Sequence, residues 1–140
     1  MAQVTERLLK ALENARDLEG FFRENENEFM SITTAQYLSD ILKLREITVA
    51  EAAKRAGLGE YAYKIFLGDR HPSRDVLIAL SFGMNLSVDE TQLLMRISKF
   101  ASLDPRDKRD STIIYGLTHG LNVFELDDIL EQHNLVTVNK

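Results

Sequence analysis

Three cationic residues near the middle of the chain have side chains suited to binding phosphate. Lys64, Arg70 and Arg74 stand within one short stretch, and ammonium and guanidinium groups bind phosphate oxygens through charge-assisted hydrogen bonds. Tyr61 and Tyr63 precede them, and a phenolic hydroxyl can donate to a phosphate or to a base edge. The grouping indicates a surface that binds a polyanion.

Glu60 opens the same stretch and opposes this chemistry. A carboxylate is repelled by a phosphate-rich duplex unless it accepts a hydrogen bond from a cytosine amino group. The aromatic residues also have a structural interpretation, which is packing into the core. We favour packing for Phe66 and leave both interpretations open for Tyr61 and Tyr63.

The sequence offers little for catalysis or for metal binding. His71, His119 and His133 are far apart, and the chain has no cysteine, so no set of converging metal ligands is evident. Asp127, Asp128 and Glu131 are typical of a solvated helix face. Nucleophile-elbow and phosphate-loop motifs are also missing. We therefore expect no enzyme activity, no metal and no cofactor.

The residues that could bind phosphate follow a pattern typical of two short helices joined by a turn. Thr48 can cap a helix, and Glu51 three residues later completes a capping box. Gly57 suits the left-handed residue that ends a helix, and Leu58 can anchor the turn. A second helix over Glu60–Leu67 is then expected, and together they form a helix-turn-helix unit. The predicted core centre comprises Ala53, Leu58, Ile65, Leu77 and Leu80.

This pattern resembles the lambda-repressor-like, or XRE-type, DNA-binding domain over about Thr34–Phe100. Thr48–Leu58 follows the family's T-x-x-E-x-A-x-x-x-G-hydrophobic segment, and Arg70 with Pro72-Ser73 follows the recognition helix as in the family. The resemblance implies a five-helix bundle that binds double-stranded DNA. The implied DNA-binding residues are Thr48, Gly59, Glu60, Tyr61, Tyr63, Lys64, Arg70 and Arg74.

The predicted recognition helix departs from the family's usual residues. Family members open this helix with Ser, Arg, Gln or Thr, whereas this chain has Gly59-Glu60-Tyr61 there. The segment between Gly57 and Gly68 is also about one residue shorter than in the family. A repressor-like fold is therefore indicated more strongly than DNA binding itself.

The remaining sequence predicts an all-α protein in three parts. Residues 1–30 form an N-terminal helix over Val4–Arg23 and the polar connector Asn25–Glu28, residues 31–102 form the helix-turn-helix domain, and residues 103–140 form a C-terminal helical extension. The expected helix starts and ends, each marked by a cap, a glycine or a proline, are Thr33, Ser73, Gly83, Ser87, Asp104, Gly120 and Asn122. Leu86–Glu90 resembles Leu121–Glu125, which reflects either similar capping or a second helical pair. The tail Leu135–Val138 is expected to pack over helices.

Charge and hydropathy limit the possible partners. The net charge is −5, and residues 35–100 carry nine Lys and Arg against eight Asp and Glu, so a strongly basic surface is not expected. No apolar run is long enough to cross a membrane, and no signal peptide is evident, so we expect a cytoplasmic protein. The N-terminal helix places apolar residues on one face, which fits packing on its own domain or a homodimer contact.

Two functions remain. The first is a sequence-specific DNA-binding transcriptional regulator, which the resemblance and the Lys64, Arg70 and Arg74 cations favour. The second is a protein-interaction module that kept the fold and lost DNA binding, which Glu60 and the acidic flanking segments favour. The sequence favours the first.

Overall fold

The computed structural model describes residues 2–24 and 32–139. Throughout these residues the regular structure is helical, without strands, which confirms the all-α prediction. The chain divides into two compact units, Met1–Ile32 and Thr33–Lys140. The predicted connector Asn25–Glu28 lies outside the described residues.

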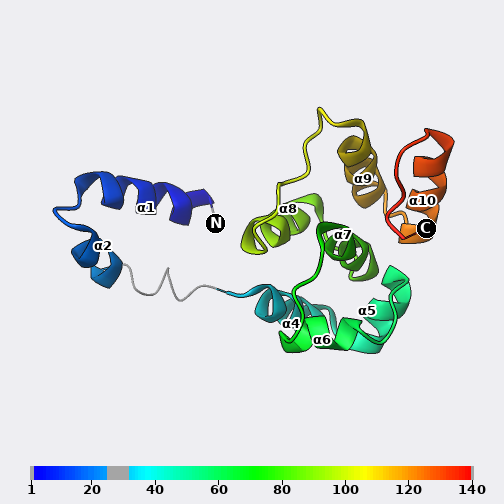
Figure 1. Ribbon diagram of the computed structural model, residues 1–140, viewed down its shortest axis with the longest axis horizontal. Coiled ribbons are helices and arrows are strands. Elements are labelled where there is room, and N and C mark those ends of the chain that lie inside the picture. The colour runs from blue at the N-terminus through cyan, green and yellow to red at the C-terminus, as the bar shows by residue number, and fades with distance from the viewer. Residues whose placement is uncertain (1, 25–31, 140) are drawn as a thin grey trace. The chain divides into compact units, whose positions relative to one another are not determined.

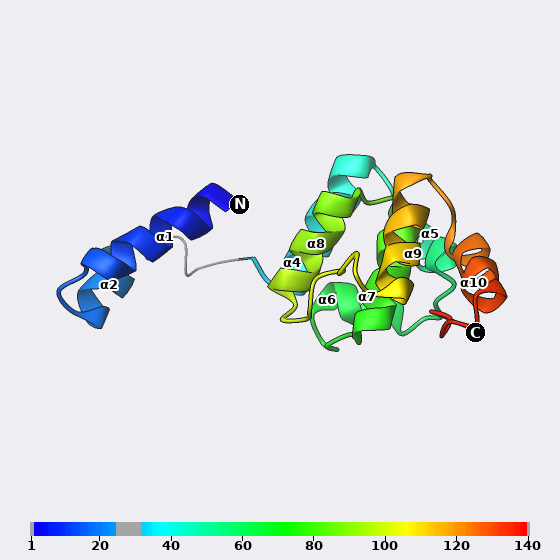
Figure 2. The ribbon, with the colours of Figure 1, turned by 90° about the horizontal axis from the view of Figure 1, so that it is seen from above.

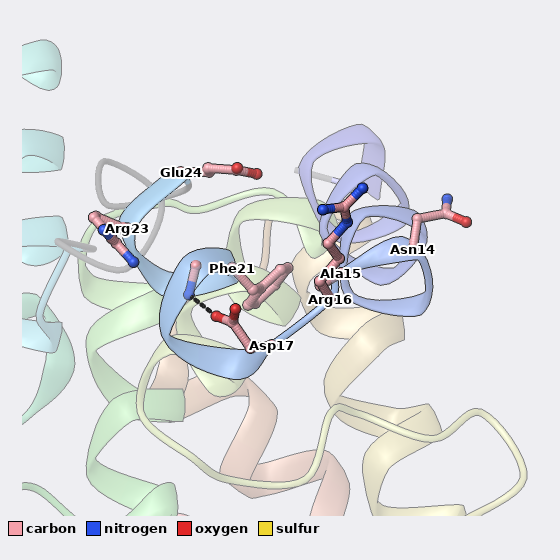
Figure 3. A pocket seen from close by; sticks show the side chains of 8 residues that line it. Asn14, Ala15, Arg16, Asp17, Phe21, Arg23 and Glu24 are labelled. Carbon is pink, nitrogen blue, oxygen red and sulfur yellow. Dashed lines mark hydrogen bonds between the residues drawn. The ribbon is translucent and has the colours of Figure 1, made fainter.

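The N-terminal unit contains two helices, α1 (Ala2–Asn14) and α2 (Leu18–Glu24), so the single helix predicted over Val4–Arg23 is wrong. Asn14 ends α1 by donating its side-chain amide to the Lys10 carbonyl at 3.0 Å. Asp17 starts α2, because its carboxylate accepts a hydrogen bond from the Gly20 amide at 2.5 Å, in the manner of an N-cap (Figure 3).

The N-terminal unit buries Phe21 but leaves three leucines largely exposed. Phe21 is 5% exposed, whereas Leu9, Leu12 and Leu18 are about half exposed. Asn14–Asp17, Phe21 and Glu24 contribute to an open hollow of about 600 Å³ (Figure 3). The charged residues that line it are Arg16, Asp17, Arg23 and Glu24.

The second unit contains seven of the described helices (Figures 1 and 2). They are α4 (Thr34–Arg45), α5 (Val49–Ala56), α6 (Ala62–Leu67), α7 (Arg74–Gly83), α8 (Val88–Ile97), α9 (Lys108–Thr118) and α10 (Val123–Gln132). The helices of the predicted C-terminal extension belong to the same compact unit, in which α9 packs against α8 and α10 packs against α7.

The central helix is α7, whose residues Leu77–Gly83 are all buried. Gly83 was predicted to stop this helix, but it is the last helical residue, and Asn85 takes the left-handed conformation with φ 55°. Gly83 serves close packing: a Cβ there would lie 2.5 Å from the Ala52 carbonyl oxygen and 2.9 Å from Ala56. Glycine thus lets α7 approach α5 at backbone distance.

The same type of connector joins three pairs of consecutive helices, namely α4 to α5, α7 to α8 and α9 to α10. A left-handed residue is followed by an apolar residue, whose amide donates to the carbonyl five residues earlier, and then by an N-cap, which is a Schellman motif leading directly into a cap. The connectors are Glu46-Ile47-Thr48, Asn85-Leu86-Ser87 and Gly120-Leu121-Asn122. The resemblance of Leu86–Glu90 to Leu121–Glu125 therefore reflects the same connector and cap. A third copy of the connector, Glu46-Ile47-Thr48, was not predicted.

The start of α9 differs from the prediction. Its N-cap is Asp107, which accepts from the Asp110 amide, rather than Asp104. Asp104 instead forms a tight turn with Arg106, whose hydrogen bonds lower the pKa of the Asp104 carboxyl.

A polar cluster fastens α4 to α8. Glu90 accepts from the Ser87 amide at 2.8 Å and from the Arg45 guanidinium at 2.7 Å, and the Tyr37 hydroxyl donates to the Glu90 carbonyl. Burial raises the pKa of the Glu90 carboxyl, but the Ser87 and Arg45 hydrogen bonds outweigh burial and leave it below its usual value.

The C-terminal tail packs over helices α5, α9 and α10 of its own unit, as predicted. The buried Asp127 carboxylate accepts from the Val138 and Asn139 amides, at 2.6 and 3.0 Å. The predicted solvated acidic face is therefore wrong for Asp127, whereas Asp128 and Glu131 are exposed. Arg109 donates to the Val136 and Thr137 carbonyls. The Asn139 side chain then reaches α5 and donates to the Ala56 carbonyl at 2.6 Å.

Four of the five predicted core residues are buried, and Leu58 is only partly buried. Phe124 and Asn139 lie within 3.2 Å of where a Gly57 Cβ would stand. The C-terminal segment therefore lies directly against the turn that Leu58 follows, and α10 appears beside α5 in Figure 2.

Gly83→Ala should lower the free energy of unfolding by about 1–3 kcal/mol, because its methyl group meets backbone atoms of α5 that cannot move aside. Urea denaturation followed by circular dichroism measures the change. Gly59→Ala is the matched control, since nothing lies within 4 Å of its Cβ position. Equal midpoints for the two variants would contradict the close α5–α7 packing.

Candidate nucleic-acid interface

The helices α5 and α6 form the predicted pair around a tight turn. The Thr48 hydroxyl accepts a hydrogen bond from the Glu51 amide at 3.1 Å and so caps α5. Gly57 ends that helix in the left-handed conformation, with φ 71°. Residues 59–61 form a turn, so α6 begins at Ala62 rather than at Glu60. Ala62, Ile65 and Phe66 face inward, which confirms the packing role expected of Phe66.

The outward face of α6 carries Tyr63, Lys64 and Leu67. Tyr63 is 47% exposed and Leu67 is 74% exposed, and Lys64 is exposed as well. Tyr63 and Leu67 are four residues apart and therefore lie on the same side of the helix. The surface of α6 is thus mainly apolar, with one cation.

The loop after α6 contributes a second cation. Gly68 turns the chain with φ 84°, and Arg70 is exposed with its guanidinium 5.9 Å from the centre of the Tyr61 ring, which is within the range of a cation–π contact. Tyr61 is only partly exposed, because its side chain also packs against the hydrophobic core. Arg70 is thus held beside the start of α6 by the Tyr61 ring.

Arg70 also borders a small hollow at the N-terminus of α4. The hollow has a volume of about 250 Å³ and is lined by residues that include Thr33, Thr34, Arg70 and His71. His71 is positioned by stacking on Phe100, with ring centroids 5.7 Å apart. The first amides of a helix and its dipole favour anions, so this corner is electrostatically suited to a phosphate group.

Arg74 has a different role from the predicted phosphate contact. Its guanidinium forms a two-point ion pair with Asp110 of α9, at 3.2 and 3.0 Å, and also donates to the Ala101 and Ser102 carbonyls. These bonds fix the loop between α8 and α9. Arg74 is therefore occupied within the fold.

A second ion pair lies beside the first. Arg109 Nη1 of α9 is 3.0 Å from Asp75 Oδ1 of α7, so the Arg-Asp dipeptides at 74–75 and 109–110 pair with each other. Each guanidinium faces the carboxylate of the other helix. This arrangement holds α9 against the first turn of α7.

The other predicted site residues lie near α6 and are either neutral or negatively charged. Thr48 is exposed and uses its hydroxyl as a cap, whereas Gly59 and Glu60 are exposed in the turn before α6. Asp69, in the loop after α6, is also exposed. Carboxylates therefore stand at both ends of the outward face.

Two exposed cations of α5 were not predicted as site residues. Lys54 and Arg55 line a hollow of about 430 Å³ together with Asn122 and the half-exposed Phe124 of α10. Their position opposite the buried alanines of α5 follows from helical periodicity. Their proximity to Phe124 depends on tertiary packing and has no local sequence signal.

Over the described part of the chain, no group of His, Asp and Glu side chains is arranged to hold a metal ion. Within the same residues, no helix has the length and apolar character needed to cross a membrane. Comparisons of the chain with models of protein families, with curated proteins and with solved structures each gave no match.

The structural role of Arg74 is tested by a double-mutant cycle with Asp110. Arg74→Ala and Asp110→Ala should each lower the free energy of unfolding by about 1–3 kcal/mol, because each change leaves a mostly buried partner unpaired. Their coupling should exceed about 0.5 kcal/mol. Denaturant titration measures all four proteins. Arg106→Ala, whose side chain is 89% exposed, is the control, and additive effects at Arg74 and Asp110 would refute the pairing.

Proposed function

We propose that the protein is a sequence-specific DNA-binding regulator that inserts α6 into the major groove. The observation that carries the proposal is the outward face of α6, where Lys64 and two side chains without negative charge project from a helix fixed by its inner face. A major groove admits one α-helix. A short helix behind a tight turn suits that insertion.

Lys64, Arg70 and the N-terminus of α4 supply the phosphate contacts in this proposal. Lys64 and Arg70 are exposed at α6 and in the loop that follows it. Arg70 lies beside the first turn of α4 in the small hollow. Its guanidinium and the first amides of α4 can therefore bind the same stretch of DNA backbone. Arg74 is left out, because Asp110 already binds it.

Lys64→Ala and Arg70→Ala should each weaken binding to every duplex and reduce the salt slope of log K by about one. Glu60→Gln should strengthen non-specific binding, because it removes one repulsion. Fluorescence anisotropy with a random-sequence duplex, titrated between low and physiological salt, measures these changes.

Lys108→Ala, on α9, is the matched control for loss of one exposed cation. It should leave both affinity and salt slope unchanged. A protein that retains no duplex even at low salt would refute the proposal.

A protein-interaction module is the second candidate, favoured by the 74% exposure of Leu67. A leucine exposed on the outer face of a helix suits contact with an apolar partner surface. A protein-interaction function is also favoured by the carboxylates at the two ends of α6, Glu60 and Asp69, and by the net charge of −5. In that case α6 would bind a protein, and the fold would act as a scaffold.

Self-association through the N-terminal unit is part of the proposal. Leu9, Leu12 and Leu18 remain about half exposed there, and so small a unit has little core of its own. A second copy would cover these side chains. Dimers also suit DNA-binding proteins that recognise two half-sites.

The combined change of Leu9, Leu12 and Leu18 to Gln should shift the protein towards monomer in sedimentation velocity at micromolar concentration, because it removes the apolar contact surface. Leu44→Gln is the control, since Leu44 is 79% exposed in the second unit. An unchanged sedimentation coefficient in the triple variant would rule out this contact.

A further inference from the structure

The outer surface of α6 presents few hydrogen-bonding groups. Its three inward residues leave Tyr63, Lys64 and Leu67 outside. These side chains offer one phenolic hydroxyl, one ammonium group and two apolar surfaces. Neither Arg, Asn nor Gln, the residues that bind guanine and adenine edges through two hydrogen bonds, stands on this helix.

Apolar side chains read one feature of the major groove. The C5 methyl of thymine is the apolar group that a base pair presents there, and it distinguishes thymine from cytosine and from the purines. Leu67 is 74% exposed and Tyr63 is 47% exposed, so both side chains are suited to cover such methyls.

The distance between Tyr63 and Leu67 along α6 is comparable to the spacing of base pairs in a duplex. Four residues of α-helix rise about 6 Å, and successive base pairs are about 3.4 Å apart. Tyr63 and Leu67 therefore span about two base-pair steps when α6 lies along the groove. Lys64, next to Tyr63 in sequence, is exposed and can contact a phosphate.

We propose that α6 recognises thymine methyl groups on adjacent or next-adjacent base pairs through Leu67 and Tyr63. This inference rests on the proposed DNA-binding function and specifies what the helix reads. Lys64 and Arg70 then supply sequence-independent affinity, whereas Leu67 and Tyr63 supply the sequence preference.

The test compares thymine with uracil, which differ by this methyl group alone. A pool of duplexes with 20 randomised base pairs (about two helical turns) is selected on the full-length protein at low salt and sequenced. The enriched duplex is then synthesised with thymine or with deoxyuridine at the enriched positions. Affinities are measured by fluorescence anisotropy.

The protein should enrich thymine-containing duplexes and bind the uracil form about fourfold more weakly per methyl, the factor expected from burying one such group. Leu67→Ala should lose most of this discrimination at one position. Leu44→Ala, which truncates an exposed leucine of α4, should keep it. Lys64→Ala should weaken binding to both forms by the same factor.

The possible outcomes separate the inference from the function on which it rests. Equal affinity for the thymine and uracil forms, or a selection that enriches no sequence, would overturn thymine readout while DNA binding stands. Full discrimination by Leu67→Ala would overturn the role of Leu67. Failure to retain any duplex would overturn DNA binding and thymine readout together, and would leave the outer face of α6 to a protein partner.

Discussion

The second unit depends on how closely α5 can approach α7. Seven consecutive residues of α7 are buried, so other elements cover this helix on every side. On the α5 side, Gly83 lies against Ala52 and Ala56 with no room for a Cβ. On the α9 side, Gly116 packs against the Phe82 ring, and a Cβ added at Gly116 would lie only 3.1 Å from that ring. Two glycines therefore determine how near the surrounding helices lie.

The position of α6 follows from this packing. Because α5 is fixed on α7, the left-handed Gly57 directs the chain into α6 at a defined angle, and Phe124 and Asn139 lie against that turn. The ion pairs of Arg74 and Arg109 hold α9 on the start of α7, and Arg109 also binds the tail that ends on α5. The C-terminal segment thus supports the same turn that positions α6.

Local chemistry explains which features the sequence predicted. A cap or a left-handed residue acts within about five positions, so Thr48, Ser87 and Asn122 were identified correctly. Two of the errors concern residues whose partners lie further along the chain. Arg74 has its partner 36 positions away, and Asp127 accepts amides of the tail. Their residue types suit both an exposed site and an internal contact, and only the packing of α9 and the tail decides between them.

The ion pairs also change how the net charge should be understood. Arg45, Arg74 and Arg109 are each paired with a carboxylate of another element, so these cations and their partners contribute little field at the surface. Around α6, the exposed cations Lys64 and Arg70 are matched by the exposed carboxylates Glu60 and Asp69, which leaves that region nearly neutral. A ligand of α6 therefore gains little from long-range attraction. In the proposed DNA complex, Lys64 and Arg70 therefore act through direct contact with phosphates rather than through long-range attraction. The Tyr63 and Leu67 side chains add apolar contacts, which depend on the shape of the bound surface.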